Sequence, residues 1–184
     1  MGTSPPELFL AHLARLAGGV EPVFFQIEAT AGLAAVVAVA YRGYPSRGQM
    51  TAFTYGLSLA EHVEWTAGKP ELCICVRSMD ERWAQAVAYT VDQMRVMSPF
   101  SRGTAINFGA RISKESKMDG FLVSESRVLT RYDLTVDVGA DRPITIAGIY
   151  PTYQSERDYV AVHGLDALWQ RVPDPTDVKR PPAA

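Results

Sequence analysis

The sequence predicts a single α/β domain built on a central β-sheet with helices packed against it. Its 184 residues are enough for one domain with a sizeable core and too few for two well-packed ones. The 47% hydrophobic and 21% charged fractions are those of a globular protein, neither disordered nor fibrous. The stretch from Gln49 to Ser78 contains two strand-type runs around a polar connection, which indicates a pair of central strands on which the other elements pack.

The segments around that pair alternate between strand and helix periodicity. Expected strands are residues 23–28, 33–41, 50–57, 71–77, 104–110, 121–124, 134–138 and 144–150. A turn at Gly32 would join the first two into a hairpin, although residues 33–41 are also compatible with a short helix, and Pro151 would end the last strand. Expected helices are residues 5–17, 153–162 and 165–172, and a helix that is capped by Ser78 or Asp80 and ends near Met97. The first of these ends at Gly18 and Gly19 and is an amphipathic cover helix.

The domain is expected to span residues 1–172, with the helix at residues 5–17 included. Residues 173–184 contain four prolines, and Val178 is their one large apolar side chain. A segment with so little apolar surface gains little by packing. The sequence therefore predicts a disordered, proline-rich tail after residue 172.

The charge balance and the cysteines limit the partners and the compartment. With 18 basic and 20 acidic side chains the net charge is −2, which gives no long-range attraction for polyanions and argues against nucleic acid. Cys73 and Cys75 would share one face of a strand and are poorly placed to bridge to each other. The start of the chain lacks the features of a signal peptide, and the apolar run from Ala29 to Tyr41 is too short to span a membrane. We therefore expect a cytoplasmic protein without a membrane segment.

One pattern suggests a serine hydrolase. Ser58 lies in the run Gly56-Leu57-Ser58-Leu59-Ala60 after a predicted strand, as a nucleophile does in a strand-to-helix elbow. Asp137 and His163 would complete a triad in the expected chain order. The last elbow glycine is replaced by Ala60, and Gly68 and Pro70 soon interrupt the following segment, so a plain glycine turn is the stronger interpretation.

A second pattern suggests a metal site and fails on spacing. His62-Val63-Glu64, followed by Pro70 and the two cysteines, resembles a zinc deaminase signature. That signature needs Cys-x-x-Cys directly after proline, whereas here two residues intervene and the cysteines are two apart. The sequence therefore predicts no metal and no other cofactor, and it makes Cys73 and Cys75 buried hydrophobic residues.

Two blocks of short motifs resemble the suppressor-of-fused domain family. The first block is Thr51-Ala52-Phe53-Thr54-Tyr55-Gly56-Leu57-Ser58, then Glu71-Leu72-Cys73-Ile74-Cys75-Val76, then Trp83-Ala84. The second is Met118-Asp119-Gly120-Phe121-Leu122-Val123, then Ile149-Tyr150-Pro151-Thr152-Tyr153 with Glu156, and then His163-Gly164-Leu165-Asp166-Ala167-Leu168. Their joint order covers roughly residues 20–172 and carries the specificity, because each piece consists of common residues.

The resemblance implies an α/β (α+β) domain with a mixed sheet flanked by helices, and protein binding rather than catalysis. Animal relatives sequester a transcription factor, and bacterial relatives look like immunity proteins that neutralise toxins. This chain lacks the second lobe of the animal form, which favours the bacterial stand-alone type. We expect a protein partner, such as a toxin domain, and the sequence leaves the partner's identity, the interface and the oligomeric state open. A structural subunit of a larger assembly is a third alternative after the hydrolase.

The resemblance also implies which residues do what. Binding positions are Tyr55, Ser58, Glu71, Tyr150, Tyr153 and Glu156, and structural positions are Gly56, Trp83, Gly120 and Pro151. For the two glutamates an internal hydrogen-bonding role is an equal alternative to partner contact.

Overall fold

The described part of the chain forms one mixed β-sheet with helices on both faces. The computed structural model describes residues 4–28 and 32–184; the first residues of the N-terminal stretch and of the apolar run used above lie outside these ranges. The strands are β1 (Pro22–Ile27), β2 (Val36–Arg42), β3 (Met50–Tyr55), β4 (Lys69–Val76), β5 (Ala105–Asn107), β6 (Gly120–Glu125), β7 (Thr135–Val136) and β8 (Ile144–Thr152). The helices are α1 (Pro5–Ala17), α2 (Arg82–Met94), α3 (Gln154–His163) and α4 (Leu165–Trp169).

The strand order within the described residues is β1-β2-β3-β4-β8-β6-β5, and β7 pairs with β8. Neighbours pair antiparallel except β4 and β8, which are parallel, so the sheet is mixed. The expected fold class is confirmed. The predicted hairpin is the β1–β2 pair, and the central stretch forms the antiparallel β3–β4 pair.

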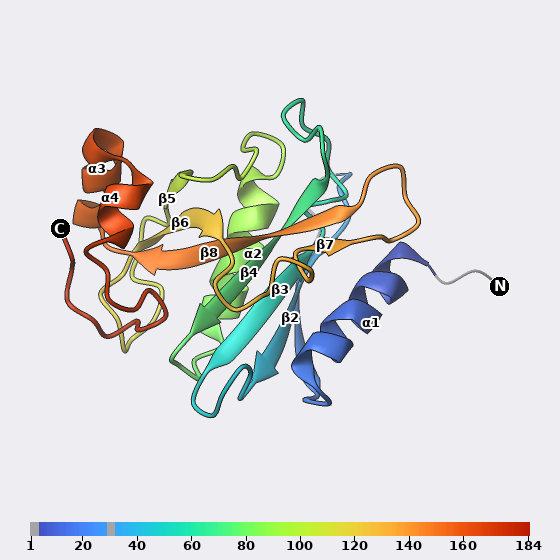
Figure 1. The fold of residues 1–184 in the computed structure, drawn as a ribbon, viewed down its shortest axis with the longest axis horizontal. Coiled ribbons are helices and arrows are strands. Elements are labelled where there is room, and N and C mark those ends of the chain that lie inside the picture. The colour runs from blue at the N-terminus through green and yellow to red at the C-terminus, as the bar shows by residue number, and fades with distance from the viewer. Residues whose placement is uncertain (1–3, 29–31) are drawn as a thin grey trace.

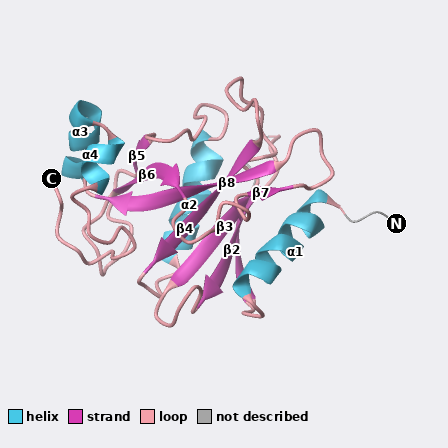
Figure 2. Cartoon of the chain, viewed as in Figure 1, coloured by secondary structure: helices cyan, strands magenta, loops and turns pink. Residues whose placement is uncertain are grey.

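The two faces of the sheet are covered by different helices (Figures 1 and 2). Phe9 and Leu13 of α1 pack with Val39 and Phe53 on one face. On the other face lies α2, which contains the fully buried Trp83. It packs against strand side chains that alternate with Val39 and Phe53 along the same strands. Both faces are therefore apolar, as expected for central strands between two helical layers. No helix in the described ranges is long and apolar enough to cross a membrane.

The end of β8 differs from the prediction. Pro151 was expected to end the strand, but it lies inside β8 opposite Phe121, and the strand continues to Thr152. The pairing of β8 with β4 stops at Gly148. Beyond that residue β8 pairs with β6 on one side, and its other side is unpaired. A proline lacks an N–H donor and is tolerated where one side of a strand is unpaired.

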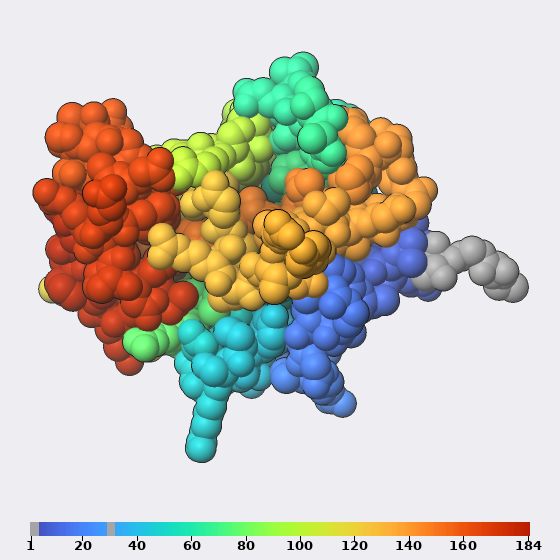
Figure 3. Space-filling model, viewed as in Figure 1, coloured from blue at the N-terminus to red at the C-terminus, as the bar shows by residue number. Residues whose placement is uncertain are grey.

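Residues 173–184 also differ from the prediction of a disordered tail. Val178 is fully buried in the core on the α2 face, and the Arg77 N–H donates to the Thr176 carbonyl at 2.8 Å. Arg180 is buried and forms an ion pair with Glu156 of α3. In Figure 3 this segment forms one side of the molecule together with α3 and α4. The tail packs because specific partners elsewhere in the chain bury its few interacting side chains.

Candidate functional site

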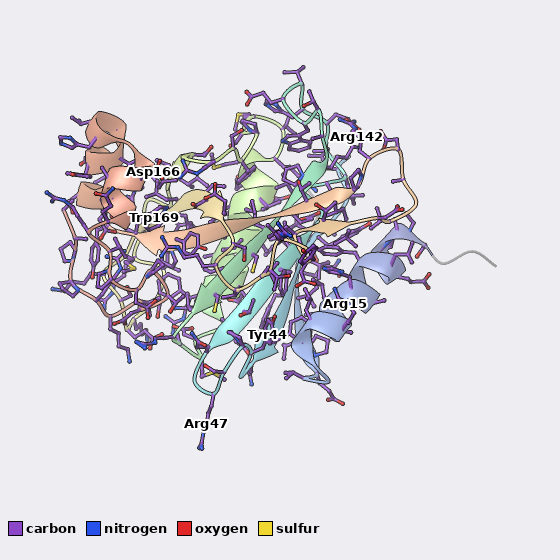
Figure 4. The ribbon with its side chains drawn as sticks, viewed as in Figure 1. Arg15, Tyr44, Arg47, Arg142, Asp166 and Trp169 are labelled. Carbon is purple, nitrogen blue, oxygen red and sulfur yellow. The ribbon has the colours of Figure 1, made fainter. Side chains whose placement is uncertain are left out.

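The residues predicted to bind a partner separate into two groups at opposite ends of β8. Tyr55 and Ser58 line one hollow together with Ile144, the first residue of β8. The other group, Tyr150, Tyr153 and Glu156, lies at or just after the last residues of the same strand. Figure 4 labels Arg142 near the first end and Trp169 near the second. The six positions therefore do not form one surface.

The buried side chain of Glu71 binds the turn after β3, next to the first end of β8. Its carboxylate is fully buried and accepts hydrogen bonds from the hydroxyl of Thr54 at 2.6 Å, the N–H of Gly56 at 2.8 Å, and both the N–H and the hydroxyl of Ser58 at 3.0 and 2.7 Å. A longer bond of 3.4 Å comes from the Leu57 N–H. Burial raises the pKa of Glu71, and these hydrogen bonds oppose that shift. Glu71 thus holds the turn after β3, the internal role that the sequence left as an alternative.

Gly56 shows why this turn needs glycine. Its φ is +133°, and a Cβ there would lie 2.9 Å from the Ala35 carbonyl oxygen and 3.0 Å from the Val36 Cα. The backbone of β3 therefore approaches the start of β2 too closely for a side chain. Gly120 is similarly crowded, because a Cβ there would overlap the Ile106 carbonyl and the Arg157 guanidinium. A side chain at either position would therefore require the neighbouring backbone or side chain to move.

Gly56→Ala is expected to lower the free energy of unfolding by about 2–4 kcal/mol, the combined effect of backbone strain and overlap with β2. Gly19→Ala is the matched control, because Gly19 also has a positive φ, +91°, but has nothing within 4 Å of its Cβ position. It should lose only about 1 kcal/mol. Urea denaturation of both variants measures the difference, and equal losses would show that close approach to β2 is unimportant.

The hydrolase triad is not assembled. Ser58 is 7% exposed and its hydroxyl donates to Glu71 rather than to a histidine. His163 lies at the end of α3 and stacks on Tyr159 with ring centroids 4.3 Å apart. The Asp137 carboxylate accepts the N–H of Gly139. The three predicted members of the triad therefore do not meet, and Ser58 has no histidine partner. No cluster of metal-ligating side chains occurs among the described residues either, and Cys73 and Cys75 are free, buried thiols.

The hollow beside Ser58 has a charged rim. It has a volume of about 190 Å³ and is lined by Pro5, Tyr55, Ser58, Leu59, Lys69, Val138, Ala140, Asp141, Arg142 and Ile144. The Lys69 ammonium and the Arg142 guanidinium both pair with Glu61, the latter at 2.7 Å. Hydrogen bonds from these two cations lower the pKa of Glu61, whose side chain is 66% exposed. Asp141, which also lines the hollow, pairs with Arg142 at 3.2 Å, so exposed carboxylates of the chain bind both cations.

A second, apolar hollow adjoins the first. It has a volume of about 230 Å³ and is lined by Pro6, Leu10, Phe24, Val37, Val39 and Tyr55. Tyr55 belongs to both hollows, and its ring centroid lies 5.7 Å from that of Phe9 in α1. We call the two hollows together the α1 groove. It runs beside α1 from the apolar side chain of Phe24 to the cations Lys69 and Arg142.

The second end of β8 is engaged internally. Tyr150 is buried; its hydroxyl donates to the Glu125 carbonyl at 2.7 Å, and its ring lies 5.3 Å from that of Trp169 in α4. The Tyr153 hydroxyl donates to the Arg180 carbonyl at 2.5 Å. Contact of this group with a partner remains a prediction, while its visible contacts attach α4 and the C-terminal segment to the sheet.

Glu156 is the centre of that attachment. Its carboxylate is fully buried and accepts both Nη groups of Arg180, with 2.9 Å to Nη2. It also accepts the N–H groups of Tyr153 at 3.1 Å and Ala183 at 3.0 Å. Glu156 therefore connects the start of α3 with the last residues of the chain.

Several residues of the α1 groove were not found from the sequence. Lys69 was visible as part of the polar connection, but nothing marked it as a partner of Arg142. Phe24 was assigned to a strand without a functional role. Arg142 is 73 residues from Lys69 in the sequence, and the two meet only because β4 and β8 are parallel neighbours. No local pattern could have indicated this.

Solved structures of suppressor-of-fused proteins superpose on nearly the whole chain. A homologue from Neisseria gonorrhoeae has a TM-score of 0.75 at 16% identity, covering 95% of this chain and 94% of its own. A chain of the Sufu–Fu complex has a TM-score of 0.70 at 12% identity, covering 98% and 93%. This chain has the suppressor-of-fused fold. Drosophila Suppressor of Fused also has a TM-score of 0.70 at 12% identity, and this chain spans 51% of it.

The resemblance predicted from the short motifs is confirmed at the level of the suppressor-of-fused fold. No family model and no curated protein matches the sequence. At such low identity the fold is retained although most side chains differ.

Proposed function

We propose that this domain is a non-enzymatic module that binds another protein through the α1 groove. The observation that carries the proposal is that an apolar hollow and a hollow with a charged rim share the single side chain Tyr55. Membership of a similar chain in the Sufu–Fu complex supports protein binding as the class of function. In its specific form the proposal is an immunity-type protein of the cytoplasm that neutralises a toxin or sequesters a partner.

The groove suits a segment with both apolar and acidic side chains. An apolar side chain placed beside Phe24 and Tyr55 would lose contact with water, which is worth roughly 25 cal/mol per Å² buried. An acidic side chain at the other end would take the place of Glu61 on Lys69 and Arg142. Because Glu61 is largely exposed, this exchange would require little rearrangement of the fold.

Leu59→Asp is expected to weaken capture of the partner about tenfold or more, because Leu59 is 50% exposed and lines the groove. Val162→Asp is the matched control, since Val162 is 77% exposed on α3, away from the groove. The measurement is affinity purification of each variant from cells that also produce a toxin encoded beside its gene, together with a growth assay for protection. Equal behaviour of the two variants, or the absence of any captured toxin, would contradict the proposal.

A further inference from the structure

We propose that the open edge of β1 receives an extended strand of the partner. This incoming strand carries a basic residue at each of its ends, and its apolar side chains are directed into the apolar hollow of the α1 groove. The proposal rests on protein binding as the function and specifies how the partner is recognised. Four observations on β1 and its neighbours carry it.

β1 is an edge strand that is available along its whole length. All six of its residues pair with β2, and no other described strand pairs with it. Every second N–H and C=O group of an edge strand points away from the sheet and can pair with an added strand. The opposite edge, β5, has three residues and therefore offers fewer backbone groups for pairing than the six-residue β1.

The side chain at the centre of β1 is exposed beside an apolar hollow. Phe24 lies opposite Val39 and is 54% exposed, and both line the hollow of about 230 Å³. An added strand would place its own side chains about 4.5–5.5 Å from those of β1 on the same face. One of them would therefore cover Phe24 and reach Leu10 and Pro6 of α1, which line the same hollow.

Two carboxylates flank this edge and have no partner among residues 4–28 and 32–184. Glu21 directly precedes β1 and Glu28 directly follows it, and both are exposed. Neither makes a hydrogen bond or an ion pair with any residue in the described ranges. They are placed to pair with one basic residue at each end of an incoming strand.

The same charges disfavour a second copy of this chain as the occupant. If two β1 strands paired antiparallel with Phe24 opposite Phe25, Glu21 of each copy would lie opposite Glu28 of the other. Like charges directly opposite each other destabilise a strand pair. A different protein with basic strand ends fits this edge better than a homodimer does.

The test uses the full chain and an eight-residue peptide in which three apolar residues alternate with threonines between two terminal lysines. We expect saturable binding and slower amide hydrogen exchange at the outward-facing N–H groups of β1. N-methylation of one alternate set of peptide amides should abolish binding, while methylation of the other set should leave it intact, because only one set faces β1. Absence of binding, the same effect from both methylated peptides, or binding without protection of β1 would overturn the proposal.

Charge reversal supplies the specificity control. The double variant Glu21→Lys with Glu28→Lys should bind the lysine-ended peptide about tenfold more weakly, and should recover binding to a peptide with terminal glutamates. Both positions are exposed, so the variant should keep the stability of the parent chain. If the toxin is still captured through Leu59 while these reversals change nothing, strand addition at β1 fails and protein binding through the groove stands. If Leu59→Asp has no effect on capture while the peptides bind as described, strand addition at β1 stands and protein binding through the groove fails.

Discussion

Arg180→Met is expected to lower the free energy of unfolding by about 3–5 kcal/mol. Arg180 is 4% exposed and Glu156 is fully buried, so removing the guanidinium leaves a carboxylate without its counter-ion in the interior. Methionine keeps most of the volume, which limits the effect to charge and hydrogen bonding. Urea denaturation followed by tryptophan fluorescence gives the loss, and proteolysis should then cleave the chain after residue 172 more readily.

Two further variants separate the buried pair from its surroundings. Lys179→Met is the matched control, because the neighbouring Lys179 side chain is 63% exposed and pairs with Glu115 at 3.4 Å; it should cost less than about 1 kcal/mol. Glu156→Gln combined with Arg180→Met should regain part of the loss, since no unpaired charge remains and the amide oxygen can still accept the Tyr153 N–H. Similar small losses for Arg180→Met and Lys179→Met would show that the pair does not hold the segment.

The C-terminal segment shows where composition misleads. Four prolines and one large apolar side chain predicted disorder, because composition counts only what the segment itself can bury. The structure instead provides the missing interactions from outside, through Glu156, 24 residues away, and through the Arg77 N–H at the end of β4. A segment that is held by two distant partners carries no local signal of order.

The strands were predictable because each face of the sheet is buried under a helix. The apolar run from Val36 to Tyr41 and the apolar run from Leu72 to Val76 follow directly from that burial. The turn around Ser58 was also found, although its serine first suggested catalysis. The groove as a whole was not predictable, because Phe24, Tyr55 and Arg142 come from three distant strands or loops and meet only after the sheet is assembled.

Glu71→Leu is expected to cost about 4 kcal/mol or more. The substitution would leave the Gly56 and Ser58 N–H groups and two hydroxyls buried without their acceptor, at roughly 1–3 kcal/mol for each group that stays unsatisfied. Ser58→Ala is the matched control, because it removes one hydroxyl and leaves the acceptor in place; it should cost about 1 kcal/mol. Urea denaturation compares the two, and a loss for Glu71→Leu no larger than that of Ser58→Ala would show that the turn is held by other contacts.

The pH dependence of stability tests the ionisation of Glu71 separately. Burial raises its pKa in the folded state above the ordinary value of 4.5, so the folded chain binds the proton more tightly than the unfolded chain does. The contribution of Glu71 is therefore fully present below about pH 4.5 and is lost as the pH rises through the higher pKa of the folded state. Relative to Glu71→Gln, which does not titrate, the parent chain should become less stable over that interval. A parent chain that gains stability over the variant as the pH rises would show that the hydrogen bonds to Glu71 outweigh its burial, and that the turn is organised around a carboxylate ion.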